Sequence, residues 1–221
     1  MFMSRASLKP AAMGGSGALA AFLSQSAERV GQSHHLVWSL FGDRAGARPF
    51  LYRLHGAGPA QPITIVSAEC PTDAHNLWDI ETKPFTLLGN LRDGDELLWA
   101  IRVNATRKQG DKRRCIVMEE RRKGDPRGYS EIAQAVVPAW LHAKLLAAGL
   151  DAAADGMAVT AYDRKRFSRS LAERDQVTVA MADVSGRGVV RSAEALRAAV
   201  RSGIGAARSY GCGLLLIRRA G

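Results

Sequence analysis

The sequence predicts an α+β protein built from two tandem βαββαβ units, and three observations lead to that prediction. Short runs of alternating apolar residues, typical of half-buried strands, recur along the 221 residues. Segments with helical spacing separate these runs. Each half of the chain gives nearly the same order of elements, which indicates a tandem ferredoxin-like, or RRM-like, architecture. The pattern alone leaves one continuous α+β domain as an alternative.

The first half supplies the order β, α, β, β, α, β. Residues 2–8 alternate as a strand does, and Pro10 ends the run. Residues 27–41 predict a helix, because their apolar side chains recur at helical spacing. The elements that follow are strands at residues 49–54 and 62–69, a short helix near residues 73–78 and a strand at residues 95–103. We expect this first domain to cover residues 1–106.

The second half, residues 107–221, repeats the pattern as a second domain. Residues 129–148 predict a helix that ends at Gly149, with a break or a late start at Pro138. Ser192 is expected to cap a last helix. The other expected elements are strands at residues 115–118, 157–167, 176–181 with 188–190, and 214–217, and the last helix at residues 193–200.

The cysteines and the apolar segments limit where the protein works. Cys70, Cys115 and Cys212 are odd in number, far apart and without a CxxC motif, so we expect no disulfide framework and no structural zinc site. A reducing cytoplasm fits this pattern. No run of eighteen apolar residues exists, and the amino terminus lacks a clear signal-peptide pattern, so we expect neither a membrane partner nor secretion.

The net charge of +10 is concentrated in two segments. Residues 102–127 hold ten Lys or Arg against four Asp or Glu, and residues 164–174 hold five against one. Charge gathered in this way is typical of a surface that binds a polyanion such as nucleic acid. A solvated basic face that keeps the protein soluble is the alternative.

Residues 203–213, GIGAARSYGCG, form a glycine-rich segment between the last helix and the last strand. Glycine permits close backbone approach and positive φ. The spacing is not GxGxxG and the segment leads into a strand, which excludes a dinucleotide-binding fingerprint. An arginine and an aromatic residue within such a loop favour contact with RNA, although a tight helix-to-strand connection explains the glycines equally well.

Four short sequence patterns occur along the chain in the same order as in a known protein family. They are residues 34–41 (HHLVWSLF), 97–106 (LLWAIRVNAT), 139–145 (AWLHAKL) and 203–216. With these patterns the chain resembles the CRISPR-associated endoribonucleases of the CasE (Cse3) type, in the RAMP superfamily. The resemblance implies two ferredoxin-like domains and metal-independent cleavage of precursor RNA at the base of a repeat hairpin. It also implies that the product stays bound in a type I-E surveillance complex, with that guide RNA and the other subunits as partners.

The resemblance assigns the catalytic role to His34, four residues before Trp38. A histidine titrates near neutral pH and can act as acid or base in such a reaction. Helical geometry places His34 at the border of the apolar face, where packing can hold its ring, and His35, the rival candidate, on the outer side. Family members often carry a tyrosine three residues earlier, where this chain has Gly31. A guide-RNA-binding subunit that does not cut is therefore the alternative function.

The expected RNA contacts lie in the basic segments and in the glycine-rich loop. They are Arg102, Arg107, Lys108, Lys112, Arg113, Arg114, Arg164, Lys165, Arg166, Arg169, Gly203, Gly205, Arg208, Ser209, Gly211 and Gly213. No HExxH, DxD or paired-carboxylate motif occurs, so we expect no metal and no cofactor.

Overall fold

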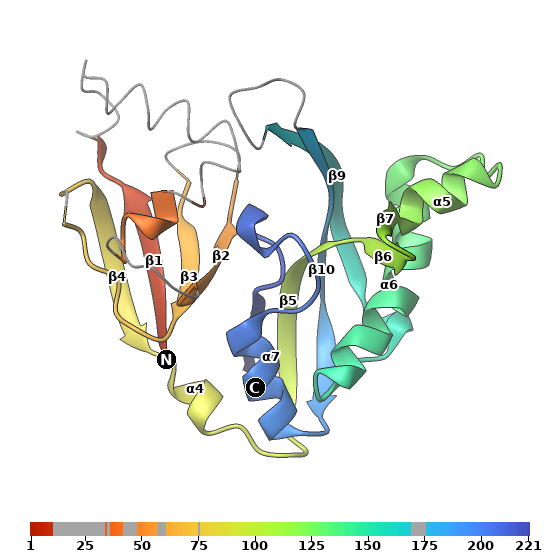
Figure 1. Ribbon diagram of the computed structural model, residues 1–221. Helices are drawn as coiled ribbons and strands as arrows, with labels where there is room; N and C mark the ends of the chain where they lie inside the picture. The colour runs from red at the N-terminus through yellow and green to blue at the C-terminus, as the bar shows by residue number, and fades with distance from the viewer. Residues whose placement is uncertain (11–33, 35, 42–47, 57–60, 75, 169–175) are drawn as a thin grey trace. The chain divides into compact units, whose positions relative to one another are not determined.

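The computed structural model describes residues 1–10, 34, 36–41, 48–56, 61–74, 76–168 and 176–221. They form two compact units (Figure 1). The first comprises residues 1–88, 166–177 and 208–211, and the second comprises residues 89–165, 178–207 and 212–221. Each unit contains an antiparallel sheet, and the α+β class with tandem ferredoxin-like folds is confirmed.

The first unit is built on a four-stranded antiparallel sheet in the order β2-β3-β1-β4. Its strands are β1 (Phe2–Leu8), β2 (Phe50–Leu54), β3 (Ile63–Ser67) and β4 (Trp78–Pro84). Described residues 34 and 36–38 are helical. Val37, Leu40 and Phe41 are buried against the sheet together with Phe50 and Tyr52. Burial of this helical face agrees with the spacing that predicted it.

The helix expected near residues 73–78 is wrong. Asp73 instead organises a turn, because its two carboxylate oxygens accept hydrogen bonds from the backbone N–H groups of Leu77 and Trp78 at 2.9 and 2.8 Å. An aspartate that binds nearby backbone N–H groups competes with helix formation. The chain leaves this turn directly into β4, a strand that was not predicted from the sequence and that pairs with β1. The short helix α4 (Thr86–Gly89) follows.

The second unit is built on the sheet order β11-β5-β10-β8, with β9 paired to β10. Its strands are β5 (Glu96–Asn104), β8 (Leu150–Asp151), β9 (Ala158–Ser168), β10 (Gln176–Val190) and β11 (Leu215–Arg219). Alternate residues of β5 are buried, as period-2 patterning predicts. The segments expected to be strand-like at 176–181 and, as its extension, 188–190 belong to one continuous strand, β10, which also includes the residues between them.

Strand β5, expected as the last strand of the first domain, joins the sheet of the second unit. It pairs antiparallel with β10, where Arg102 lies opposite Asp183, and with β11. Period-2 alternation identifies a strand but carries no information about its partner, since the pairing joins residues about 80 positions apart. The domain boundary after residue 106 stays a prediction.

Two longer helices lie between the strands of this unit along the chain. Helix α6 (Tyr129–Ala147) continues through Pro138, so the expected break is wrong. Pro138 lies on the buried face, and the carbonyl that loses its N–H partner belongs to exposed Gln134, where water can bind it. Helix α7 (Ala193–Ser202) begins as predicted, because the Ser192 hydroxyl accepts the Ala195 N–H. The 3-10 turn η1 (Ala154–Gly156) joins β8 to β9.

The basic segment forms a hairpin and a short helix. Strands β6 (Thr106–Gln109) and β7 (Lys112–Cys115) pair with each other, and α5 (Ile116–Arg122) follows at once. The strand expected at residues 115–118 is therefore wrong beyond Cys115. Ile116 and Val117 are fully buried in α5, and a short apolar run does not distinguish a strand from a buried helical turn.

Candidate active site

His34 lies in the first unit among aromatic side chains. The Trp38 Nε1–H donates a hydrogen bond to His34 Nε2 at 3.1 Å, across one helical turn. The ring of Tyr52 stacks beside the imidazole, with centroids 6.3 Å apart and planes 24° apart, and the ring of Phe50 lies 5.9 Å away. His34 is half-buried beside fully buried Val37, which confirms its predicted place at the border of the apolar face.

The bond from Trp38 assigns the protons of the His34 ring. An indole N–H only donates, so Nε2 must act as the acceptor, and a neutral imidazole then carries its proton on Nδ1. The ring is held in one orientation by this bond and by the stacked rings, as a catalytic acid or base requires. The rival candidate His35, like Gly31, lies outside the described residues.

The middle of the glycine-rich loop, residues 208–211, belongs to the same unit as His34. It forms the 3-10 turn η2 (Arg208–Tyr210). The Tyr52 hydroxyl donates to the backbone carbonyl of Ser209 at 2.6 Å, and the Tyr210 ring stacks on Phe167 at 5.0 Å. The loop is therefore fixed by side chains far away in sequence, and one face of Tyr210 is already used for packing.

Its glycines are needed for the backbone conformation. Gly203, Gly205, Gly211 and Gly213 all have positive φ, as expected from the sequence. At Gly211 a β-carbon would also come within 3.4 Å of the Tyr52 ring. These four residues therefore shape the loop, and their contact with RNA stays a prediction.

A further cation, Arg48, lies near these residues. Its guanidinium is 5.9 Å from the centre of the Phe50 ring. Burial lowers the pKa of Arg48, Tyr52 opposes this effect, and the like charge of Arg208 adds to it. Arg48 and Arg208 therefore lie close enough to repel each other, and an anion bound near both would relieve that repulsion.

Arg102, expected to bind RNA, is engaged within the second sheet. Its Nε and Nη2 donate to the two carboxylate oxygens of Asp183 at 2.8 and 2.7 Å. Burial alone would lower the pKa of Arg102, but the hydrogen bonds and charge of Asp183 hold it above its ordinary value. A bidentate pair of this kind fixes the guanidinium in place.

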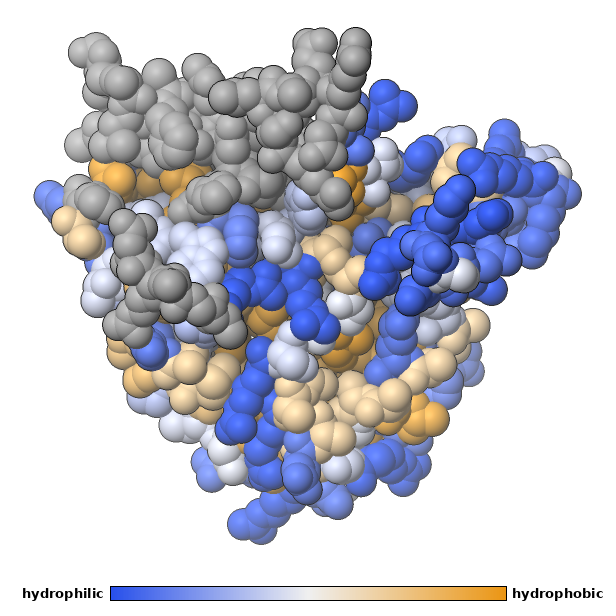
Figure 2. Space-filling view, viewed as in Figure 1, coloured by the Kyte–Doolittle hydropathy of each residue, from blue (hydrophilic) through white to orange (hydrophobic). Residues whose placement is uncertain are grey.

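The β6–β7 hairpin, in contrast, exposes its charges. Its strand register sets Arg107 opposite Arg114 and Lys108 opposite Arg113, with Lys112 at the turn, and all five are exposed. Figure 2 shows strongly hydrophilic residues covering the part of the molecule where β6, β7 and α5 lie. Like charges directly opposite each other destabilise a strand pair, so this hairpin favours a polyanionic ligand.

The second basic segment is described only in part. Arg164 and Arg166 are exposed on β9, and Lys165 lies 3.6 Å from Asp163. Arg164 borders a polar pocket of about 540 Å³ with Tyr129 and Glu131 at the start of α6. Arg169 lies outside the described residues.

Tyr52, Arg48 and the role of Trp38 were not predicted from the sequence. The spacing of four between His34 and Trp38 was a usable signal, because residues one turn apart in a helix meet. No sequence signal indicated Tyr52, because its hydroxyl partner Ser209 is 157 residues away in the chain.

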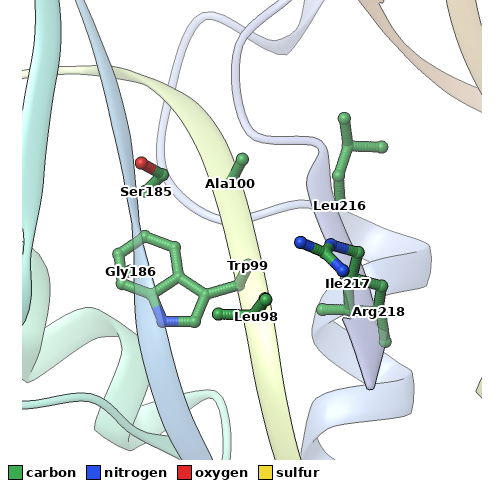
Figure 3. Close-up of a pocket in the computed structure, with 8 residues that line it drawn as sticks. All are labelled: Leu98, Trp99, Ala100, Ser185, Gly186, Leu216, Ile217 and Arg218. Atoms are coloured by element: carbon green, nitrogen blue, oxygen red, sulfur yellow. The ribbon is translucent and has the colours of Figure 1, made fainter. Parts of the chain in front are cut away.

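The second sheet also carries an apolar hollow, of about 440 Å³, that contains none of the predicted site residues. Figure 3 shows it bordered by Trp99 of β5, Gly186 of β10 and Arg218 of β11. In the part of the chain that the structure describes, the buried Trp99 Nε1–H has no hydrogen-bond partner. Within that same part, no group of three His, Cys, Asp or Glu is placed to hold a metal, and no helix has the length and apolar character to cross a membrane.

Comparison with known proteins places this geometry in a family. The model of a family described as CRISPR associated protein matches residues 1–219. No curated protein matches the chain. Thermus thermophilus Cse3, solved with an RNA representing a pre-cleavage complex, is 20% identical, with a TM-score of 0.70 and 98% of each chain covered.

Two further solved structures share the fold. Cas6e from Escherichia coli str. K-12 is 18% identical with a TM-score of 0.61, covering 99% of this chain and 100% of that one. A chain of a CRISPR RNA-guided surveillance complex is 17% identical with a TM-score of 0.66 and the same coverage. Because the family model spans almost every residue and these full-length folds agree with it, the chain belongs to the CRISPR-associated protein family that its sequence resembles.

Proposed function

We propose that this protein is an endoribonuclease that cuts CRISPR precursor RNA at the base of the repeat hairpin. It then keeps the guide RNA bound as a subunit of a type I-E surveillance complex. The observation that carries the proposal is the fixed His34 ring, held by Trp38 and Tyr52 in the same unit as loop residues 208–211. Family membership and the fold shared with Cse3 and with a surveillance-complex chain support it.

The reaction needs no metal in this proposal, because the RNA supplies its own nucleophile. The ribose 2′-oxygen attacks the adjacent phosphorus and loses its proton, and the bond from phosphorus to the 5′-oxygen breaks. The leaving oxygen takes a proton and becomes a 5′-hydroxyl, while the other product ends in a 2′,3′-cyclic phosphate. His34 gives or takes one of these protons once substrate binding frees a ring nitrogen, since Nε2 accepts from Trp38 and Nδ1 is buried in the free protein. A role of this kind contributes roughly 10²–10⁴-fold to such rates.

We assign stabilisation of the charge that develops on the phosphate to Arg48, which lies over the Phe50 ring, and to Arg208 of the loop. Arg48 and Arg208 lie near Tyr52, and preorganised charge of this kind acts more strongly where water is partly excluded. His34 supplies one of the two proton transfers, the two arginines supply positive charge, and water exchanges the other proton.

The stem of the RNA repeat hairpin is held by the exposed cations of the protein. We assign this role to the predicted residues of β6, β7 and β9, which would contact phosphates along an A-form stem. Arg102 takes part less directly, since Asp183 already binds its guanidinium. A protein with this partner works in the cytoplasm, as its widely spaced cysteines led us to expect.

Purified protein mixed with its cognate repeat hairpin in EDTA tests the proposal. We expect one cut at the base of the hairpin, with a cyclic or 3′ phosphate on the upstream product, and no cut when the 2′-hydroxyl at that position is replaced by hydrogen. Tight binding without any cut would select the alternative, a guide-RNA-binding subunit that does not process RNA. Cleavage that stops in EDTA would overturn the metal-independent mechanism.

A further inference from the structure

Tyr52 is a buried residue with contacts on two sides. It lies in β2, and none of its side chain is exposed. One side of the ring faces His34, with planes 24° apart, and the other contact is made by its hydroxyl, which donates to the Ser209 carbonyl at 2.6 Å. A single rigid side chain therefore touches both the candidate catalytic residue and the glycine-rich loop.

The hydroxyl contact is specific in its geometry. A buried tyrosine hydroxyl normally finds a hydrogen-bond partner, and here the partner is a backbone carbonyl in the 3-10 turn η2. The bond therefore fixes the main chain of the loop next to Arg208, whatever the side chain at position 209. A hydrogen bond to a main-chain atom ties this part of the loop to β2.

The ring contact restricts His34. Trp38 meets the imidazole edge-on at 80° and Phe50 meets it at 51°, while Tyr52 lies nearly parallel to it. Rotation of the imidazole would press it against the Tyr52 ring, because packed interiors leave few voids. Tyr52 thus forms one wall of the space that His34 occupies.

From these contacts we infer that Tyr52 is a positioning residue that couples the RNA-holding loop to His34. The inference rests on the proposed function and adds to it a mechanical link between the loop and the catalyst. When an RNA phosphate binds beside Arg208, the main chain at Ser209 is drawn toward it, and the Tyr52 hydroxyl transmits that movement to the ring beside His34. The imidazole is then aligned when substrate is seated.

Tyr52→Phe tests the link, because it keeps the ring and removes only the hydroxyl. We expect the single-turnover cleavage rate to fall about tenfold with little change in hairpin affinity, since small misplacements of reacting groups cost this much or more. Tyr162→Phe is the matched control. It removes a partly buried tyrosine hydroxyl bonded to Cys115 in the second unit, and it should leave the cleavage rate unchanged.

Active-site titration separates positioning from folding. A merely structural role would reduce the fraction of active molecules and leave the rate constant of the remainder intact, and that result would overturn the inference. So would a Tyr52→Phe enzyme that cuts at the wild-type rate. Tyr52→Leu, which also removes the wall, should lower the rate further and change the shape of the pH–rate profile.

A second readout does not depend on cutting. The imidazole NMR signals of His34 should shift when a repeat hairpin with a 2′-deoxy cut site is added to wild-type protein, and this shift should be largely absent in Tyr52→Phe. If wild-type protein binds but does not cut, the proposed function fails while this measurement still decides the coupling. Equal shifts in both proteins would overturn it.

Discussion

His34 in the first unit and the β6–β7 hairpin in the second are prepared for function in different ways. His34 is half-buried, and its orientation is fixed by Trp38, Phe50 and Tyr52. Lys108 and Arg113 are exposed and lie opposite each other in the hairpin. A group that moves a proton needs one orientation, which packing supplies, whereas groups that hold a polyanion need reach and charge.

The free β6–β7 strand hairpin is destabilised by repulsion between facing cations, whereas the aromatic residues around His34 carry no such repulsion. Lys108 and Arg113, which face each other, destabilise the free strand pair, whereas the charge of Arg107 is partly offset by Glu119 3.3 Å away. Phosphate groups placed between or beside the facing cations would remove that cost. Changes in the two regions should therefore fail differently. Those at the aromatic site should slow cutting, and those in the hairpin should weaken binding and alter its salt dependence.

The largest effect is expected from His34→Ala. Removing the proton-transfer group should slow cleavage about 10²–10⁴-fold, while the dissociation constant of the hairpin RNA stays nearly unchanged. His55→Ala is the control, because His55 is an exposed histidine of the same unit that bonds Thr64. Single-turnover rates and equilibrium binding check both variants. A His34→Ala protein that loses RNA affinity and cutting in parallel would break the division of labour between the two regions.

The double change Lys108→Ala with Arg113→Ala should weaken RNA binding without slowing the cutting of bound RNA. Each charged hydrogen bond to phosphate is worth about 1.5–3 kcal/mol, so affinity should fall by about a hundredfold or more while bound RNA is still cut at the normal rate. The slope of log affinity against log salt should decrease by about 0.7–0.9 for each phosphate that is no longer neutralised. Arg187→Ala, an exposed cation on β10 near Glu96, removes charge elsewhere and should change neither quantity appreciably.

Strands with a clear local pattern were predicted correctly, and features that depend on distant contacts were missed. Residues 2–8, 50–54 and 96–104 alternate clearly, and their strands were expected correctly. Residues 73–78 were misassigned because Asp73 accepts two backbone hydrogen bonds that form a turn instead of a helix. The partners of β5 were missed because they depend on tertiary pairing. Local pattern thus determines elements, and distant contacts determine how they combine.

The candidate site divides in the same way. The exposed cations were found from composition alone, since charge density is visible in any stretch of sequence. His34 was found from a resemblance and from its place on a helical face. Tyr52 was missed because its neighbours, His34 and Ser209, are brought to it only by folding. Surface chemistry can therefore be predicted locally, whereas the packing that orients a catalyst cannot.

Trp38→Phe sharpens the comparison within the aromatic site. The variant keeps an aromatic ring but removes the N–H donor to His34 Nε2, so cleavage should slow by about three- to tenfold, as the loss of one neutral hydrogen bond predicts. RNA affinity should not change. Trp140→Phe provides the control, because Trp140 lies on α6 of the second unit with Lys144 over its ring. A wild-type rate in Trp38→Phe would show that stacking alone orients His34.

The smallest effect is expected from a surface charge pair in the second unit. Arg127 donates side-chain and backbone hydrogen bonds to Asp125, and these bonds lower the pKa of that carboxyl to about 2. Because the folded state favours the carboxylate, its stabilising contribution is present above the ordinary pKa of 3.8 and is lost as the pH falls toward 2. Asp125→Asn keeps one acceptor oxygen, removes the charge and replaces the second acceptor with an NH2 donor. Wild type should therefore be slightly the more stable protein above pH 4, and the difference should vanish near pH 2 in chemical unfolding experiments. A difference that is constant with pH would mean that packing, not charge, stabilises this pair, as packing orients the His34 ring.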